Sequence, residues 1–139
     1  MKYVYHIVFL LLTISSCKQK TGDELIIQKW QCISVDAAML ENQSNDERDK
    51  FALEMLKSNY KESSIQFFVD KTYEQYIKAY DYKSQGEYNL INDGKYMICK
   101  HLDARKEEKE EQFEIMMLTD DSLKLKTKED YVLVYTKKD

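Results

Sequence analysis

Cys99 and His101 are the two side chains whose types and spacing come closest to a reactive pair. Two residues apart on a predicted strand, the thiol and the imidazole project from the same face, about 7 Å apart. That separation is too long for the hydrogen bond that activates a cysteine nucleophile. The pair could supply half of a metal site, but tetrahedral zinc needs further ligands, and Cys32 is the only other thiol beyond the N-terminal segment. We therefore expect a solvated or hydrogen-bonded histidine, no metal and no catalytic residue at this place.

The chain contains none of the common enzyme signatures. The patterns H-E-x-x-H, G-x-S-x-G and C-x-x-C are missing, and the three glycines have neither the spacing of a dinucleotide fingerprint nor that of a P-loop. Neighbouring carboxylates such as Glu107-Glu108 and Asp120-Asp121 fall in predicted turns or charged loops. Nothing makes them face each other across a cleft, as the paired acids of glycosidases must. The sequence predicts a protein that is not an enzyme.

Charge and cysteine content limit the partners and the cross-links. The formal net charge is −4 and no basic stripe is present, which argues against nucleic acid as a partner. In an oxidising compartment Cys32 and Cys99 could form a disulfide, provided that their Cα atoms lie within about 7 Å. They could equally be two small buried apolar residues.

The N-terminal segment has the layout of a signal peptide. Lys2 supplies a positive charge, and residues 4–14 form an uncharged, almost wholly apolar run. At about 1.5 Å per residue this run is too short to span roughly 30 Å of hydrocarbon as a helix. The segment Ile14-Ser15-Ser16-Cys17 that follows resembles the lipobox of bacterial lipoproteins. The alternatives are an ordinary secretory signal with an incidental cysteine, or a buried strand.

The lipobox resemblance implies an address in the bacterial cell envelope. Residues 1–16 would be removed as a signal peptide, and Cys17 would carry a diacylglycerol and further acyl chains such as palmitate, with no other cofactor. Residues 17–24 would be a short tether. Residues 18–20 lack an acidic residue after the cysteine, so we expect the membrane partner to be the outer membrane.

The rest of the chain predicts a mainly β fold. Residues 25–35 are strand-like, and residues 45–60 predict one helix with Phe51, Met55 and Leu56 on an apolar stripe. Seven further strands are expected at residues 64–69, 72–80, 85–91, 95–102, 113–118, 123–127 and 131–136. Short turns imply antiparallel neighbours, and eight such strands can close into an up-and-down barrel. The charged segment 103–112 is expected to be a long solvated hairpin tip, or a contact surface for another envelope protein.

Several segments in this order resemble the lipocalin-like lipoproteins within the calycin group, over a domain of residues 25–138. The segments are Ile27-Gln28-Lys29-Trp30, the hairpin of residues 65–73, Gly86-Glu87-Tyr88, residues 118–125 and residues 135–138. The resemblance implies an eight-stranded antiparallel barrel, with one helix after the first strand and Trp30 closing its base. Gln28 and Lys71 stand where that family has glycine. Because a non-glycine residue resists a positive φ, the turn at Lys71 should differ from the family's turn or be slightly strained.

The eleven tyrosines suggest where a ligand could bind. A phenol packs its ring and still offers a hydroxyl, so Tyr73, Tyr88 and Tyr96 could line a cup for an amphipathic or ring-bearing molecule. The alternative is that such residues fill the barrel core or coat its outer surface, since aromatic residues favour strands.

Two functions from different classes remain. One is a membrane-anchored binding module that holds a small apolar or amphipathic ligand inside the barrel. The other is an interaction protein with a filled barrel, which docks on another envelope protein as an accessory or inhibitor. An open volume of a few hundred Å³ inside the barrel would favour the first, and a filled core the second.

Overall fold

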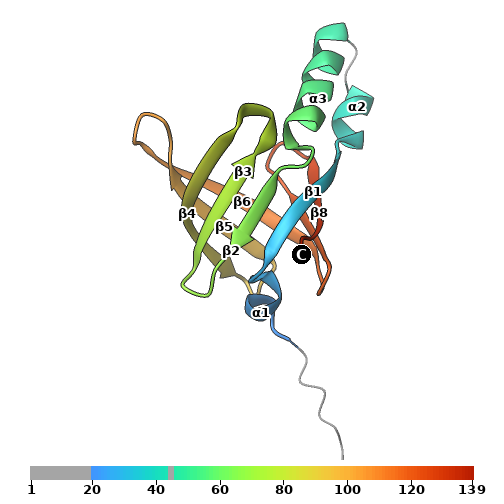
Figure 1. Cartoon of the computed structure of the whole chain (residues 1–139). Coiled ribbons are helices and arrows are strands. Elements are labelled where there is room, and N and C mark those ends of the chain that lie inside the picture. The colour runs from blue at the N-terminus through green and yellow to red at the C-terminus, as the bar shows by residue number, and fades with distance from the viewer. Residues whose placement is uncertain (1–19, 44–45) are drawn as a thin grey trace, which may run out of the picture.

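Eight strands, three α-helices and one 3-10 helix make up the part of the chain that is described, residues 20–43 and 46–139 of the computed structural model (Figure 1). The predicted signal peptide and Cys17 lie outside these residues. In chain order the elements are α1 (Gly22–Ile26), β1 (Lys29–Asp36), α2 (Ala38–Gln43), α3 (Glu47–Tyr60), β2 (Ser64–Phe67), β3 (Thr72–Ile77), η1 (Lys78–Tyr80), β4 (Tyr82–Ile91), β5 (Tyr96–Leu102), β6 (Glu108–Leu118), β7 (Ser122–Lys126) and β8 (Val132–Lys137).

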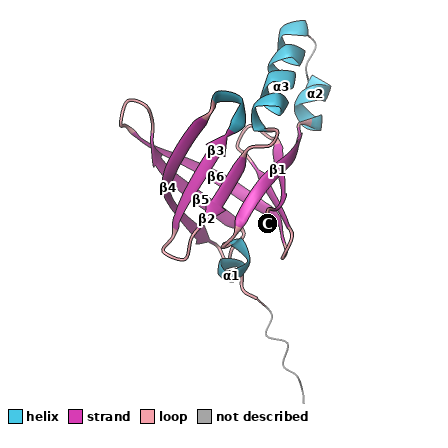
Figure 2. Ribbon diagram, viewed as in Figure 1, coloured by secondary structure: helices cyan, strands magenta, loops and turns pink. Residues whose placement is uncertain are grey.

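The strands form a closed barrel in sequence order, with every neighbouring pair antiparallel (Figure 2). Pairing of β8 with β1 closes the ring, for example Cys32 opposite Tyr135. Closure leaves no strand edge unpaired, which removes the main route to edge-to-edge aggregation. The predicted fold class, an eight-stranded up-and-down barrel with a helix after the first strand, is confirmed.

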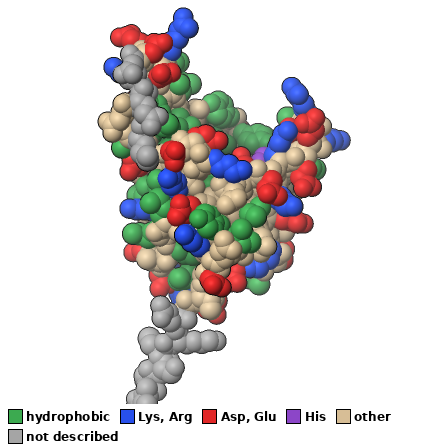
Figure 3. Space-filling view, turned by 180° about the vertical axis from the view of Figure 1, so that it is seen from behind, with side chains coloured by type: hydrophobic (Ala, Val, Ile, Leu, Met, Phe, Trp, Pro, Cys, Tyr) green, Lys and Arg blue, Asp and Glu red, His purple; other side chains and the backbone are tan. Residues whose placement is uncertain are grey.

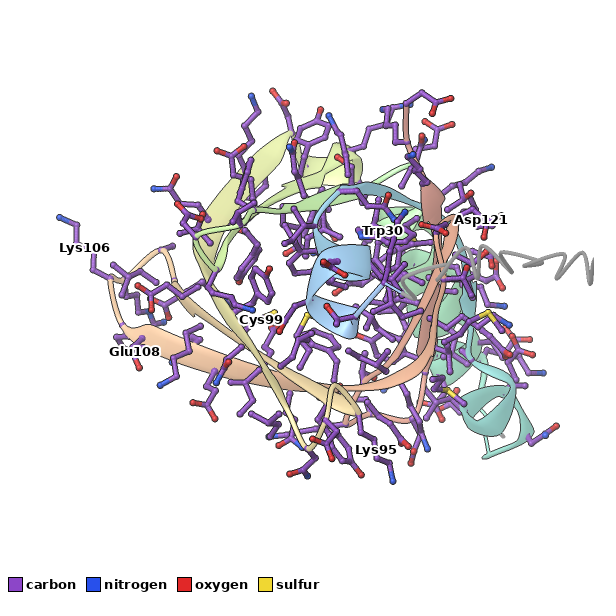
Figure 4. All side chains as sticks on the ribbon, turned by 90° about the horizontal axis from the view of Figure 1, so that it is seen from below. Trp30, Lys95, Cys99, Lys106, Glu108 and Asp121 are labelled. Carbon is purple, nitrogen blue, oxygen red and sulfur yellow. The ribbon has the colours of Figure 1, made fainter. Side chains whose placement is uncertain are left out.

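One end of the barrel is closed by α1, which the sequence analysis had assigned partly to a tether and partly to the first strand. The Thr21 side chain accepts a hydrogen bond from the Glu24 backbone N–H at 3.3 Å, and the Glu24 carboxylate accepts one from the Thr21 N–H at 2.9 Å. This reciprocal pair is a capping box, which starts the helix despite its short length. As a result β1 begins at Lys29 rather than at residue 25. Seen from below, α1 lies across the end of the barrel with Trp30 beside it (Figure 4).

The two other helices project from the opposite end of the barrel (Figure 1). Asp46 caps α3 by accepting a hydrogen bond from the Arg48 N–H at 2.9 Å, so the helix predicted at residues 45–60 begins at Glu47. The predicted apolar stripe is only partly correct. Leu56 packs against the core, whereas Phe51 is 69% exposed and Met55 is 44% exposed, because these two lie on the face of the helix opposite the buried Leu53.

Besides β1, three strands differ from their predicted bounds by three or more residues. The strand expected at residues 85–91, β4, begins at Tyr82. The strand expected at residues 72–80 stops at Ile77, because η1 turns the chain at Lys78–Tyr80. The strand expected at residues 113–118 begins much earlier, at Glu108, so half of the segment predicted to be a hairpin tip belongs to β6. The tip itself is therefore confined to residues 103–107.

Lys71, where the sequence predicted a different or slightly strained turn, adopts a positive φ of 67°. Its N–H donates to the Phe68 carbonyl at 3.2 Å, and its side chain forms an ion pair with Asp23 of α1 at 2.5 Å. A lysine in this left-handed conformation costs backbone energy that a glycine would not. The ion pair with Asp23 ties the β2–β3 turn to the closed end.

Inward-facing side chains fill the barrel from the closed end to beyond its middle. The fully or almost fully buried members of this core are Ile26, Trp30, Cys32, Phe67, Tyr73, Tyr88, Met97, Cys99, Leu123, Leu125, Leu133 and Tyr135. Trp30 has no exposed surface, and its indole N–H donates to the Ile26 carbonyl at 3.0 Å. A buried tryptophan needs such a partner, because its N–H cannot be left unsatisfied without a cost.

Candidate functional site

The barrel is hollowed at the end opposite α1. Seen from behind, the surface dips between α3 and the β5–β6 hairpin (Figure 3). The side chains that face this dip come from residues whose alternation places them inside the barrel, above the filled core. We call this region the mouth and define it by Tyr73, Tyr82, His101 and Glu111, with Tyr60 of α3 beside them.

Tyr73 and His101 form the floor of the mouth. The Tyr73 hydroxyl lies 3.4 Å from Nδ1 of His101, and the Tyr73 side chain is otherwise buried. The strands that carry them approach closely because Gly86 of β4 lies between them. A Cβ atom on Gly86 would come within 1.9 Å of the Lys100 carbonyl oxygen and 3.0 Å of the Tyr73 ring. Only glycine leaves room for this arrangement.

Glu111 is the unexpected member of the mouth. It lies directly opposite Cys99 in the β5–β6 ladder and shares the inward parity of Phe113, yet its side chain is exposed. An inward-facing carboxylate can stay exposed only where the barrel is open to water. The chemistry of this end of the barrel is therefore set by an accessible negative charge above an apolar core.

The negative charge of Glu111 contributes to raised pKa values of groups on several elements. Burial is the largest cause that raises the pKa of the Cys99 thiol and of the Tyr73 phenol, and the Glu111 carboxylate raises both further. The same carboxylate contributes to the raised pKa values of Tyr60 and Tyr131, again after burial. These groups come from α3, β3, β5 and the turn before β8, so the Glu111 charge acts on residues from several elements around it.

No described residue forms an ion pair with Glu111, whereas the neighbouring inward-facing lysine is already engaged. Lys109 lies opposite His101, and its ammonium group contacts Glu107 at 3.1 Å and Asp103 at 3.6 Å. Both carboxylates belong to the tip of the β5–β6 hairpin. The mouth therefore holds one carboxylate that is free to pair with a cationic group or a hydrogen-bond donor.

The three tyrosines predicted to bind a ligand do not share one surface. Tyr73 and Tyr88 lie in the core on either side of Phe67, with ring centroids 6.1 and 4.8 Å from its ring. The Tyr88 hydroxyl donates to the Phe68 carbonyl at 3.0 Å. Tyr96 has the opposite parity to the buried Met97 and faces outward, beside Gln112. Of the three, only the Tyr73 hydroxyl reaches the mouth, and ligand binding by any of them stays a prediction.

Both cysteines of the described residues are free and buried. Burial raises the pKa of the Cys32 thiol to about 11, with backbone hydrogen bonds opposing part of the rise. Cys99 and His101 lie on the same face of β5 as expected, and the neighbour of His101 is Tyr73. Within residues 20–43 and 46–139, no three His, Cys, Asp or Glu side chains are grouped so as to hold a metal ion.

Sequence reasoning missed Glu111 because it treated residues 103–112 as a solvated tip. The available signal was the alternation Glu111, Phe113, Ile115, which continues one face of β6 past the point where the residue types change from apolar to charged. The many charged residues in this segment made that alternation hard to recognise in the sequence. In the structure, β6 pairs with the whole of β5, and this pairing shows that β6 begins at Glu108.

No known protein family matches the chain, and no curated protein is significantly similar to it in sequence. None of the described helices has both the length and the apolar character needed to cross a membrane.

Proposed function

We propose that this protein is a lipid-anchored, lipocalin-like binding protein of the bacterial cell envelope, without catalytic activity, that holds a small amphipathic molecule at the mouth of its barrel. The observation that carries the proposal is the exposed, inward-facing Glu111 above a buried aromatic floor. A polar anchor beside apolar surface is the usual composition of a small-molecule site.

The ligand should be short and should present a cationic or hydrogen-bond-donating end. The filled core leaves no deep cup, so an apolar group would rest on Tyr73 and on the Tyr82 ring, which is 43% exposed. Glu111 would pair with the polar end, and His101 would supply a further polar contact. This differs from a deep lipocalin cup, in which the ligand would replace the core that is filled here.

The anchor would place the mouth away from the membrane. Lys20 forms an ion pair with Asp120 of the β6–β7 turn, and the Gln28 amide donates to the Asp120 carbonyl at 3.1 Å. These contacts fix the start of the described chain to the closed end. Two residues lie between Cys17 and Lys20, and the three steps along the chain reach about 10 Å. A lipid on Cys17 would therefore hold the closed end against the outer membrane.

The charge of the ligand tests the proposed site. The soluble chain from residue 18 is saturated with N-phenyl-1-naphthylamine, a neutral fluorescent probe, which is then displaced with decylamine or with decanoate. We expect the amine to compete at least about tenfold better, because a single charge-assisted contact is worth that much. Glu111→Gln should abolish the preference.

Glu110→Gln is the matched control, because it removes the same charge from the neighbouring residue on the outside of β6, where Glu110 contacts Lys100. It should leave the preference intact. Equal competition by amine and acid in the unaltered protein, or equal effects of the two substitutions, would contradict the proposed site.

The anchor has its own test. Replacing Cys17 by serine should abolish incorporation of labelled palmitate and move the protein from the membrane fraction to the soluble fraction. Two or more acyl chains bind firmly, since each buried methylene contributes about 0.8 kcal/mol. Labelling that persists in Cys17→Ser would contradict the proposal.

The docking function remains a second candidate because of α3. This helix extends beyond the barrel and exposes Phe51 and Met55, and apolar side chains grouped on a projecting helix are typical of interaction surfaces. Under this alternative, Phe51→Ser with Met55→Ser should abolish cross-linking to an envelope protein in cells and leave probe binding at the mouth unchanged.

A further inference from the structure

The outer wall of the barrel carries a groove of about 680 Å³ that is separate from the mouth. It runs across the outward faces of β1 to β4, the strands nearest the viewer in Figure 1. Alternation shows that the side chains of Lys29, Gln66, Glu74 and Gln85 point outward, since Trp30, Ile65, Phe67 and Tyr73 on the same strands belong to the core.

The groove is built from polar side chains in register across four strands. Lys29 lies opposite Gln66, Gln66 opposite Glu74, and Glu74 opposite Gln85. This row crosses β1, β2, β3 and β4 at one level. Beside it Ser64 lies opposite Tyr76, and Tyr76 opposite Lys83. Neighbouring strands, and therefore neighbouring side chains of the row, are about 4.8 Å apart. This spacing is close to the length of one sugar ring in an extended glycan.

Three polar side chains of this row have no side-chain partner among the described residues. Among the described residues, no side-chain hydrogen bond or ion pair involves Gln66, Glu74 or Gln85. Tyr76 is held instead, because its hydroxyl donates to Asp81 at 3.1 Å. The groove thus offers two free amides and a free carboxylate beside an aromatic ring of fixed position.

We propose that this groove binds a neutral oligosaccharide laid across the strands. The amides both donate to and accept from sugar hydroxyls, the carboxylate accepts from them, and a tyrosine ring covers the apolar face of a sugar. Residues of both charges line the groove, namely Lys29, Lys83, Lys138, Glu74 and Asp81. This mixture does not suit a ligand of one charge such as nucleic acid, which needs a continuous basic track. The site goes beyond the proposed function and does not depend on it.

The test is calorimetric titration of the full-length protein, kept in a detergent without a sugar headgroup. The probes are cellotetraose, maltotetraose and chitotetraose, together with the matching disaccharides. We expect at least one tetrasaccharide to bind saturably with one-to-one stoichiometry. Its disaccharide should bind about tenfold more weakly, because it spans fewer rungs and loses hydrogen bonds.

Substitutions then place the site. Gln66→Ala with Gln85→Ala should weaken tetrasaccharide binding by about tenfold or more. Gln85→Ala alone, at an exposed position, should weaken it measurably and guards against a folding defect in the double variant. Gln112→Ala, an exposed amide on the outward face of β6, is the control and should have no effect. Absence of binding by all three tetrasaccharides would overturn the proposal, and so would binding that the Gln66 and Gln85 substitutions leave unchanged.

Discussion

The two ends of the barrel use the same strand geometry for opposite purposes. At the closed end the inward positions hold Ile26 and Trp30, both without exposed surface, and α1 lies across the opening (Figure 4). At the mouth the inward positions hold His101 and Glu111, which stay accessible to water. The alternation of inward and outward side chains is continuous between the ends. The difference lies only in residue type, which changes from apolar to polar along β5 and β6.

This change in residue type separates the residues that contribute to stability, near α1, from those that we expect to contribute to binding, at the mouth. Residues near α1 contribute burial and have no free polar group, so their loss should cost stability. Residues at the mouth contribute little burial and have unpaired charge, so their loss should affect binding. The following experiments test whether stability depends on the closed end and binding on the mouth.

The largest effect should come from Trp30 at the closed end. Trp30→Ala removes a fully buried ring and the hydrogen bond to the Ile26 carbonyl, and should lower the free energy of unfolding by about 3–5 kcal/mol. Urea unfolding followed by circular dichroism measures this, since the variant has no tryptophan. A loss below about 1 kcal/mol would mean that the closed end is not sealed by this residue.

The next largest effect should be a loss of folding stability at high pH, caused by ionisable groups buried in the core. Burial raises the pKa of the Cys32 thiol from 9.0 to about 11 and that of the Tyr88 phenol from 10.0 to about 12. The unfolded chain therefore loses these protons first as pH rises, which favours unfolding. The contribution of these two groups to stability should be constant below about pH 8 and should be lost progressively up to about pH 12.

For Cys32 alone the loss should reach about 2–3 kcal/mol. Urea midpoints at neutral pH and at pH 10.5 measure the change, and Cys32→Ala should reduce it. Stability that does not change over this range would contradict the burial of these groups.

A smaller loss of stability is expected from Gly86, which lies between the filled core and the mouth. Gly86→Ala places a Cβ atom against the Lys100 backbone, so β4 and β5 must separate. Overpacking of this kind costs about 1–3 kcal/mol. The same change should move the Tyr73 ring away from His101. Thermal unfolding together with the chemical shifts of His101 would detect both, and an unaltered His101 signal would show that Gly86 does not position the floor.

Much of this architecture could be predicted from the sequence, and the failures have physical causes. Short turns and alternation identified the strands, and the lipocalin-like segments indicated a closed barrel with Trp30 at one end. The 3.6-residue pattern located α3 but could not show that Phe51 lies beyond the barrel, because exposure depends on where a helix is docked. The short α1 was missed because Thr21 and Glu24 form a capping box too brief to produce periodicity. Glu111 was missed because local charge conceals which way a residue points.

The smallest effect on stability should come from Glu111 at the mouth. Glu111→Gln alters an exposed charge without an ion-pair partner among the described residues, so the free energy of unfolding should change by no more than about 0.5 kcal/mol. Chemical unfolding measures this value. A loss of several kcal/mol would place Glu111 among the structural residues and remove the contrast between the two ends.

The most direct test of the account is a residue-by-residue map of amide chemical shifts as decylamine is added to the soluble chain. The account predicts that the changes concentrate at Tyr73, His101 and Glu111 and fade toward the closed end, with none at Ile26 or Trp30. Changes centred on Trp30 and α1, or confined to the outer wall, would show that the mouth is not the binding end.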